Sequence, residues 1–174
     1  MTKLLVIPGI DGSGPEHWQT RWEAELGDEA VRIAPASWSE PDLADWLAAI
    51  DRAVEPGMLV ATHSLGNLAL AHWLALNPGA ELAGALLVAP PDATRAGFPS
   101  VARSFAIEAV PLPVRSIVVA SDDDPYASVE ASTALAAGWG ARLVVLSGLH
   151  HLGAESGVGD WPVGRALLAE LDPA

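Results

Sequence analysis

The chain has 174 residues, of which 51% are hydrophobic and 18% charged, as in an ordinary globular domain and unlike a disordered chain. Nine basic residues against 22 acidic ones give a formal net charge of −13 at pH 7. A surface this acidic repels phosphate backbones and anionic bilayers, so we expect no nucleic-acid or membrane partner. The absence of cysteine excludes disulfides, cysteine metal sites and a cysteine nucleophile.

Neither a leader nor a membrane span is visible in the sequence. The apolar run at 3–7 has no basic-then-apolar signal before it, and no apolar run is long enough to cross a bilayer. We therefore expect a cytoplasmic protein. The length fits one domain, residues 1–174. Nothing in the sequence indicates the oligomeric state.

Short apolar runs alternate with longer helical patterns along the chain. Each apolar run is continuous, which suits a strand covered on both faces of a parallel sheet. We expect an α/β fold, a doubly wound and mostly parallel sheet of about six strands with helices on both faces. The strands are expected at 3–7, 31–34, 57–62, 84–89, 115–120 and 142–146, and the helices at 16–26, 40–54, 66–76, 128–138 and 161–171.

A glycine-rich loop follows the first strand and has two interpretations. Gly9, Gly12 and Gly14 precede a helix, as in a phosphate-binding loop, but the Gly-Lys-Ser/Thr ending and the Gly-x-Gly-x-x-Gly spacing are absent. In folds that carry a nucleophile elbow, this loop supplies one N–H of the oxyanion hole instead. Ile10 is then the expected donor.

The clearest helical pattern lies at 40–54, where apolar side chains fall on one face at Leu43, Trp46, Leu47, Ile50 and Val54. Ser39 and Asp42 have the spacing of a capping box. Pro41 fits the first turn of the same helix.

Ser64 ends an apolar strand-like run and lies two residues before Gly66, at the start of an alanine- and leucine-rich helix. This pattern is typical of a nucleophile elbow, in which a serine is held on a strained turn between strand and helix. Strain requires small neighbours, a need that Gly66 meets and Thr62 does not. The N–H of Leu65 can then stabilise an oxyanion. The alternative is an ordinary turn with a surface serine.

The stretch from Pro90 to Pro113 is long for a connection within one domain and contains both phenylalanines, Phe98 and Phe105. One interpretation is a loop with a short helix near 100–108, packed on the edge of the sheet. The other is a small cap over the active site, lined by the two phenylalanines.

Two later strands end in groups that would activate a serine. A serine hydroxyl needs a base, and the base needs an orienting carboxylate. In elbow folds the acid and then the histidine follow the serine, at the carboxyl ends of strands. Asp122, Asp123 and Asp124 follow 115–120, and His150 and His151 follow 142–146. If one of the three aspartates is the acid, we expect the other two to lie in a solvated turn. Adjacent residues on an extended loop point in opposite directions, so we expect only one of the two histidines to face Ser64.

The other histidines are weaker candidates for the base. His63 adjoins Ser64, so we expect its side chain to point elsewhere, and His72 is expected to be partly buried on the following helix. His17 precedes the serine but can line the site. Trp18, next to it, is a further lining candidate, although packing is the more common role of a tryptophan.

Four segments resemble the small serine hydrolases of the retinoblastoma-binding-protein-nine and YdeN type, a minimal branch of the α/β-hydrolase fold. The segments are Pro8-Gly9 through His17-Trp18-Gln19 and Trp22, then 63–66, 123–126 and 151–162. The resemblance implies that the acid is Asp124, before proline, and that the base is His151. Thr62, His150 and Gly153 depart from the family pattern, where smaller residues, glycine and asparagine are usual.

The resemblance implies a serine hydrolase that cleaves a small ester, thioester or amide with Ser64, His151 and Asp124. Its partner would be a small-molecule acyl substrate, and the reaction needs no metal or other cofactor. A non-catalytic interaction or ligand-binding module on the same scaffold is the first alternative, because fold does not dictate function. A nucleotide-binding domain is the second, and only the glycine-rich loop supports it.

Overall fold

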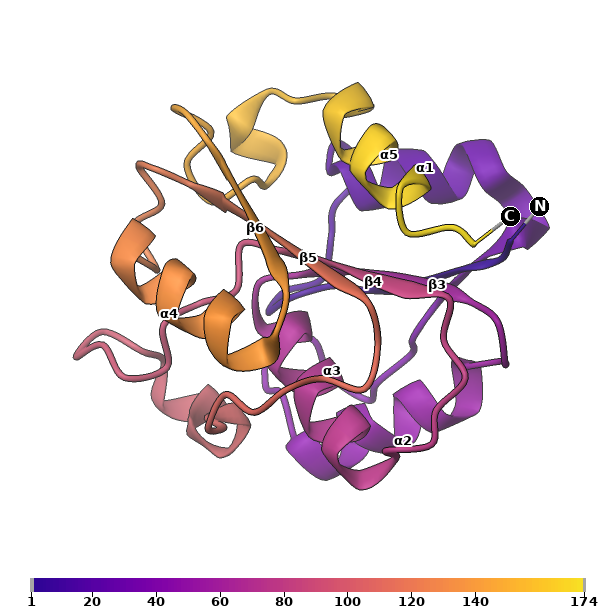
Figure 1. Cartoon of the computed structure of the whole chain (residues 1–174), viewed down its shortest axis with the longest axis horizontal. Helices are drawn as coiled ribbons and strands as arrows, with labels where there is room; N and C mark the ends of the chain where they lie inside the picture. The colour runs from indigo at the N-terminus through magenta and orange to yellow at the C-terminus, as the bar shows by residue number, and fades with distance from the viewer. Residues whose placement is uncertain (1, 174) are drawn as a thin grey trace.

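The computed structural model describes residues 2–173 and contains a sheet of six strands that all run parallel. Their order is β2-β1-β3-β4-β5-β6 (Figure 1). The direction of winding therefore reverses between β1 and β3, as in a doubly wound sheet. The strands are β1 (Leu4–Ile7), β2 (Ala30–Arg32), β3 (Leu59–His63), β4 (Gly84–Val88), β5 (Ser116–Ser121) and β6 (Arg142–Leu146).

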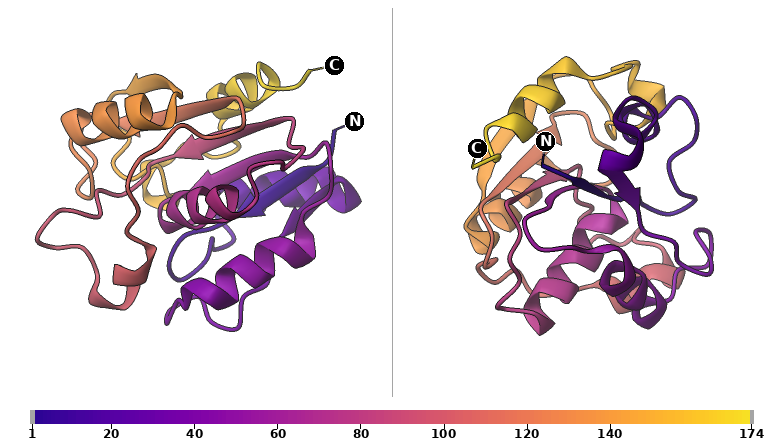
Figure 2. Two further views of the ribbon diagram at one scale, coloured as in Figure 1. Left: turned by 60° about the horizontal axis from the view of Figure 1, so that its bottom comes forward. Right: turned by 90° about the vertical axis from the view of Figure 1, so that its right-hand side faces the viewer.

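Helices cover both faces of this sheet, as the sequence predicts. One face carries α1 (Trp18–Leu26) and α5 (Pro162–Ala169), and the other carries α2 (Leu43–Ala53), α3 (Leu65–Leu76) and α4 (Val129–Trp139) (Figure 2). Each face has its own hydrophobic core. Among residues 2–173, no helix combines the length and the apolar character that crossing a membrane requires.

The prediction of a capping box at the start of α2 is wrong. Asp42 is itself the N-cap, because its Oδ1 accepts a hydrogen bond of 2.9 Å from the N–H of Asp45. The helix begins at Leu43, so Pro41 precedes it instead of occupying its first turn. An aspartate at the N-cap satisfies an N–H at the helix start, and Ser39 lies too far away to do so.

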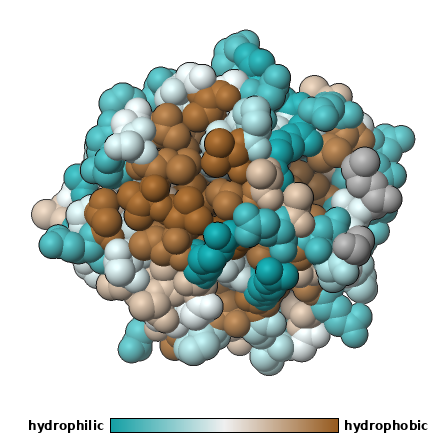
Figure 3. Space-filling model, turned by 45° about the horizontal axis from the view of Figure 1, so that its top comes forward, coloured by the Kyte–Doolittle hydropathy of each residue, from teal (hydrophilic) through white to brown (hydrophobic). Residues whose placement is uncertain are grey.

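The two edge strands are less buried than their apolar sequences predict. Every residue of β3, β4 and β5 is buried, whereas β2 is half-buried and β6 is partly exposed. An edge strand has a neighbour on one side only, and α5 packs mainly on β4. Val144 and Leu146 of β6 are therefore only half-buried. The face of the molecule seen in Figure 3 carries a wide hydrophobic area.

The segment 90–113 connects β4 to β5 outside the sheet (Figure 2). Its short 3-10 helix, Ser100–Phe105, packs against α3 and ends earlier than the predicted 100–108. Phe105 is fully buried, with its ring 5.3 Å from that of Trp46 on α2. This aromatic contact anchors the segment to the helical layer.

The start of helix α3 packs very closely against the backbone at the end of β1. A Cβ on Gly66 would overlap the carbonyl oxygen of Ile7 and lie 2.6 Å from that of Pro8. No side-chain rotation relieves a clash with backbone atoms. The glycine expected from the elbow pattern is therefore required by contact with the first strand.

We expect the Gly66→Ala substitution to lower the free energy of unfolding by about 1–3 kcal/mol, the usual effect of overpacking. Gly79→Ala is the matched control, because a Cβ there meets nothing within 4 Å. Its effect should stay within about 0.5 kcal/mol. Urea denaturation followed by circular dichroism measures both variants, and equal stabilities would contradict the close packing of α3 on β1.

Candidate active site

Ser64 lies on the turn between β3 and α3, at the carboxyl edge of the sheet. Its backbone angles, φ 52° and ψ −123°, fall in a region that residues with side chains rarely adopt. Its N–H donates to the carbonyl oxygen of Val88 at 3.0 Å. The winding of the sheet reverses beside this turn, which is where open parallel sheets bind ligands. The turn therefore has the geometry expected of an elbow.

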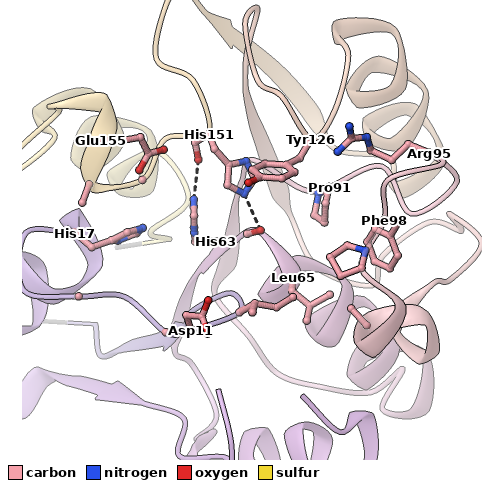
Figure 4. A pocket seen from close by; sticks show the side chains of 18 residues that line it. Asp11, His17, His63, Leu65, Pro91, Arg95, Phe98, Tyr126, His151 and Glu155 are labelled. Atoms are coloured by element: carbon pink, nitrogen blue, oxygen red, sulfur yellow. Dashed lines mark hydrogen bonds between the residues drawn. The ribbon is translucent and has the colours of Figure 1, made fainter. Parts of the chain in front are cut away.

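Ser64, His151 and Asp124 follow β3, β6 and β5 and form one hydrogen-bonded row. Figure 4 shows the part of this row that runs from His151 to the serine. Ser64 Oγ is 2.7 Å from His151 Nε2, and His151 Nδ1 is 2.9 and 3.0 Å from the two oxygens of Asp124. The Asp124 side chain is only 2% exposed. A carboxylate on Nδ1 holds the proton there, so Nε2 is left free to accept one from the serine.

Asp123 and His150 form a second pair beside the first, at the surface. His150 Nδ1 is 2.9 Å from Asp123 Oδ2, and the two side chains are 59% and 36% exposed. The loop is not extended as predicted, because His150 has a positive φ of 48°. His150 is paired with Asp123, and it is His151 that lies within hydrogen-bonding distance of Ser64.

Asp122 and Asp123 are exposed, as predicted, but they also bind the histidine loop, where Asp123 accepts a hydrogen bond of 2.7 Å from the N–H of His150. Asp122 accepts hydrogen bonds from the hydroxyl of Ser147 and the N–H of Gly148, and Asp123 accepts one from the hydroxyl of Ser121. Those hydroxyl bonds are the largest cause that holds the pKa of each carboxyl below its usual value. The sequence signal that could have predicted these bonds is the Ser-Gly turn at the end of the strand next to the aspartates.

Asn67, which the sequence pattern did not single out, fastens the elbow from the first turn of α3. Its Nδ2 donates to the carbonyl oxygens of Ser64 and Val88, both at 2.8 Å, and its Oδ1 accepts from the hydroxyl of Thr62 at 2.5 Å. Thr62 is fully buried. This hydrogen bond accommodates a residue larger than the elbow pattern prefers. A single asparagine in an apolar helix, three residues after the serine, is the signal that could have found it.

The loop after β1 lies directly against Ser64. A Cβ on Gly9 would lie 2.8 Å from Ser64 Cβ, so a glycine is needed for this approach. Buried Gln19 anchors the end of the loop to the sheet. Its side chain donates hydrogen bonds to carbonyl oxygens of β1 and β3, at 3.3 and 3.0 Å. The predicted oxyanion residues, Ile10 and Leu65, both line the cavity beside Ser64. Within residues 2–173, neither N–H takes part in a turn or loop hydrogen bond.

His17 and His63 pack in a row against His151. The ring centroids are 4.6 Å apart between His17 and His63 and 4.9 Å apart between His63 and His151. His63 Nε2 lies 2.8 Å from the carbonyl oxygen of His151 (Figure 4). The prediction that His63 points elsewhere is therefore wrong, since its ring supports the backbone of His151. His72 is half-buried on α3, as predicted.

Burial keeps the rings of His17 and His63 neutral at pH 7. It is the largest cause that lowers the pKa of His17 from 6.5 to about 4, with the charges of Arg32 and His151 adding to the shift. It also lowers the pKa of His63 well below 6.5. His17 Nδ1 accepts from the N–H of Gln19 at 3.2 Å, so its proton lies on Nε2. The row of rings therefore places no charge beside His151 above pH 6.5.

A cavity of about 430 Å³ opens over Ser64 and His151. Two of the predicted lining residues, His17 and Phe98, border it. Trp18 and Phe105 do not, because both are fully buried. Trp18 packs beside His17 and donates through Nε1 to a carbonyl of the loop after β6, 2.9 Å away. Its size suits it to the core, and the prediction that it touches substrate is corrected.

The two sides of this cavity differ in polarity (Figure 4). Asp11, His17 and Glu155 lie on one side of the serine. Pro91 and Phe98 lie on the other side, together with Tyr126 and Arg95. The polar side carries two exposed carboxylates. The carboxylates therefore gather on one side of the cavity, and the apolar side chains of Pro91 and Phe98 lie on the other, next to a single guanidinium.

The neutral state of His17 makes stability depend on pH. Below pH 6.5 the unfolded chain binds a proton at His17 that the folded chain accepts only near pH 4. The free energy of unfolding should thus fall as pH drops from 6.5 to 4, by at most about 1.4 kcal/mol per pH unit from this group. His17→Asn removes the titration and keeps an N-cap acceptor. Urea denaturation at pH 5 and pH 7 should show a smaller pH effect for the variant, and an equal effect would contradict a neutral His17.

A family model described as "Serine hydrolase" matches residues 4–170. A structure described as a YdeN-like hydrolase from Pectobacterium atrosepticum is 32% identical, with a TM-score of 0.86 over 99% of this chain and 94% of that one. The ydeN gene product of B. subtilis is 20% identical, with a TM-score of 0.79 over 98% of both chains. An esterase from Rhodococcus sp. is 15% identical, with a TM-score of 0.68 over 98% of this chain and 91% of that one.

The last two structures lie below 25% identity and show the α/β-hydrolase fold alone. The search of curated proteins finds no match to the sequence. The family model covers nearly the whole chain, and the Pectobacterium structure is similar in both sequence and shape. With the parallel sheet and the serine turn described above, these matches show that the chain belongs to the serine hydrolase family and is a small α/β-hydrolase of the YdeN type.

Proposed function

We propose that the chain hydrolyses a small ester, thioester or amide through a catalytic triad of Ser64, His151 and Asp124. The observation that carries this proposal is the unbroken hydrogen-bond row from Ser64 Oγ through His151 to buried Asp124, at 2.7 and 2.9 Å. A serine in this row is activated because its proton has a neutral acceptor. The row opens into a cavity large enough for a small substrate.

The reaction begins when Ser64 Oγ attacks the substrate carbonyl and its proton passes to His151 Nε2. Asp124 stabilises the resulting imidazolium through Nδ1. The N–H groups of Ile10 and Leu65 stabilise the oxyanion. His151 then protonates the leaving group, and the acyl group remains on Ser64 as an ester. Water, deprotonated by His151, attacks this ester, releases the acid and restores the serine.

The surroundings support His151 in this role. His63 holds its backbone, and neutral His17 and His63 place no second cation beside the imidazolium. The ring of Tyr126 packs on its other side, 4.5 Å away between centroids. These contacts restrict His151 to the orientation in which it reaches Ser64.

Ser64→Ala should abolish hydrolysis of p-nitrophenyl butyrate and labelling by a fluorophosphonate probe, and leave the fold intact. Loss of a triad nucleophile lowers kcat by about 10⁶ in comparable enzymes. Circular dichroism of the variant controls for folding. A wild-type protein that the probe leaves unlabelled would indicate a binding module, and hydrolysis by Ser64→Ala within tenfold of wild type would exclude the serine mechanism.

The two aspartate–histidine pairs provide an internal comparison. His151→Gln and Asp124→Asn should each lower kcat/KM by at least about 10³, because both remove a member of the triad. His150→Gln should leave kcat/KM within about threefold of wild type, and Asp123→Asn within about tenfold, since Asp123 only positions the loop. Initial rates on p-nitrophenyl butyrate measure all four variants.

A reversed order would contradict the assignment. If His150→Gln were inactive and His151→Gln active, the surface pair would have to act in catalysis. The neighbour Asp122→Asn serves as a further control, because it loosens the same loop from the side away from Ser64.

A further inference from the structure

A second cavity, of about 330 Å³, lies between the segment 90–109 and α4. No group of the triad borders it. Its lining is predominantly apolar and comes from three parts of the chain: Leu68, then Pro90, Pro91, Asp92, Ala93, Thr94, Ile107, Glu108 and Ala109, then Ala127, Ala131, Ala134 and Leu135. Its size falls within the range of small-molecule sites.

The second cavity adjoins the cavity over Ser64 at three places. Pro91 lines both of them. On α3, Leu65 lines the first and Leu68 the second, and residues three apart share a helix face. After β5, Tyr126 borders the first cavity and Ala127 the second. The same three parts of the chain therefore contribute to the lining of both cavities.

The walls of the second cavity are held together at both of its ends. The N–H of Asp92 donates to the carbonyl oxygen of Tyr126 at 3.1 Å, which ties the segment 90–113 to the loop after β5. At the far end, a Cβ on Gly138 would lie 2.6 Å from that of Ala109, so the segment and α4 touch there. Between these two contacts the facing residues of α4, Ala131 and Ala134, are small and leave the space open.

We propose that the second cavity binds the distal part of an uncharged aliphatic acyl chain whose carbonyl is held at Ser64, a substrate assignment that rests on the proposed function. The chain passes from the serine along Leu65 and Phe98 and over Pro91. Asp92 and Glu108 are the charged residues of the second cavity's lining, and both would repel an anionic chain end. The leaving group then departs on the opposite side of Ser64, which is polar and open to water.

The size of the effect follows from burial of methylene groups. Each buried methylene contributes roughly fourfold to binding. An octanoyl chain has four methylenes more than a butyryl chain, and partial burial of these groups should raise kcat/KM at least tenfold. The acyl chain is already bound in the acylation transition state, which governs kcat/KM for these esters, so its contacts act on kcat/KM.

The test compares p-nitrophenyl butyrate and octanoate, which share a leaving group, with wild type, Ala134→Phe and Ala137→Phe. Both alanines are exposed on α4, but only Ala134 lines the cavity, so Ala137→Phe is the matched control. We expect Ala134→Phe to lower kcat/KM on octanoate at least tenfold and on butyrate less than twofold. The control should change neither value. Ala131→Leu, a smaller substitution in the same lining, should lower the octanoate value several-fold.

Three results would overturn the acyl-chain assignment while leaving the proposed hydrolase intact. They are a wild-type kcat/KM that does not rise from butyrate to octanoate, an equal loss on both esters in Ala134→Phe, and the same loss in Ala137→Phe. Absence of Ser64-dependent hydrolysis of butyrate would instead overturn the proposed function and the assignment with it. Thermal melting of each variant shows whether a loss comes from unfolding.

Discussion

The strained backbone of Ser64 is the constraint on which the site depends. Conformations of this kind cost about 1–3 kcal/mol and persist only where neighbouring contacts outweigh the strain. Here the peptide groups of Ser64 are bound on both sides, by Val88 and by Asn67. The bond from Asn67 is partly buried, so breaking it would also leave polar groups with little access to water. Gly9 and Gly66 then allow the neighbouring backbone to close around the turn.

The position of His151 depends in turn on the end of β5. Three consecutive carboxylates would repel one another at this edge, but each is engaged by different donors. Asp122 and Asp123 hold the loop that carries the histidines, and Asp124 holds the imidazole itself. His63 fixes the same loop from the side of β3. The imidazole of His151 is therefore positioned by the two strands that flank β4, and not by its own loop alone.

Much of the fold could be predicted from the sequence, because buried parallel strands are continuous apolar runs and their helices have a regular period. Ser64 could be identified because an elbow is a local pattern. The choice of Asp124 over its neighbours could not be derived in this way, since adjacent aspartates have the same chemistry and only their depth differs. Asn67 was missed, and the orientation of His63 was predicted wrongly, because both residues bind backbone carbonyl groups, which any sequence provides.

The two aspartate–histidine pairs show how burial changes the electrostatic strength of pairs that have the same side chains. The Asp123–His150 pair has a hydrogen-bond distance equal to that of Asp124–His151, but solvent screens its charges. Asp124 is enclosed, so its attraction for a charged imidazole is much stronger at the same distance. In the proposed mechanism, this is therefore the pair that stabilises the imidazolium formed when Ser64 gives up its proton. The left-handed backbone at His150 is what turns one histidine to the surface and leaves the next at the serine.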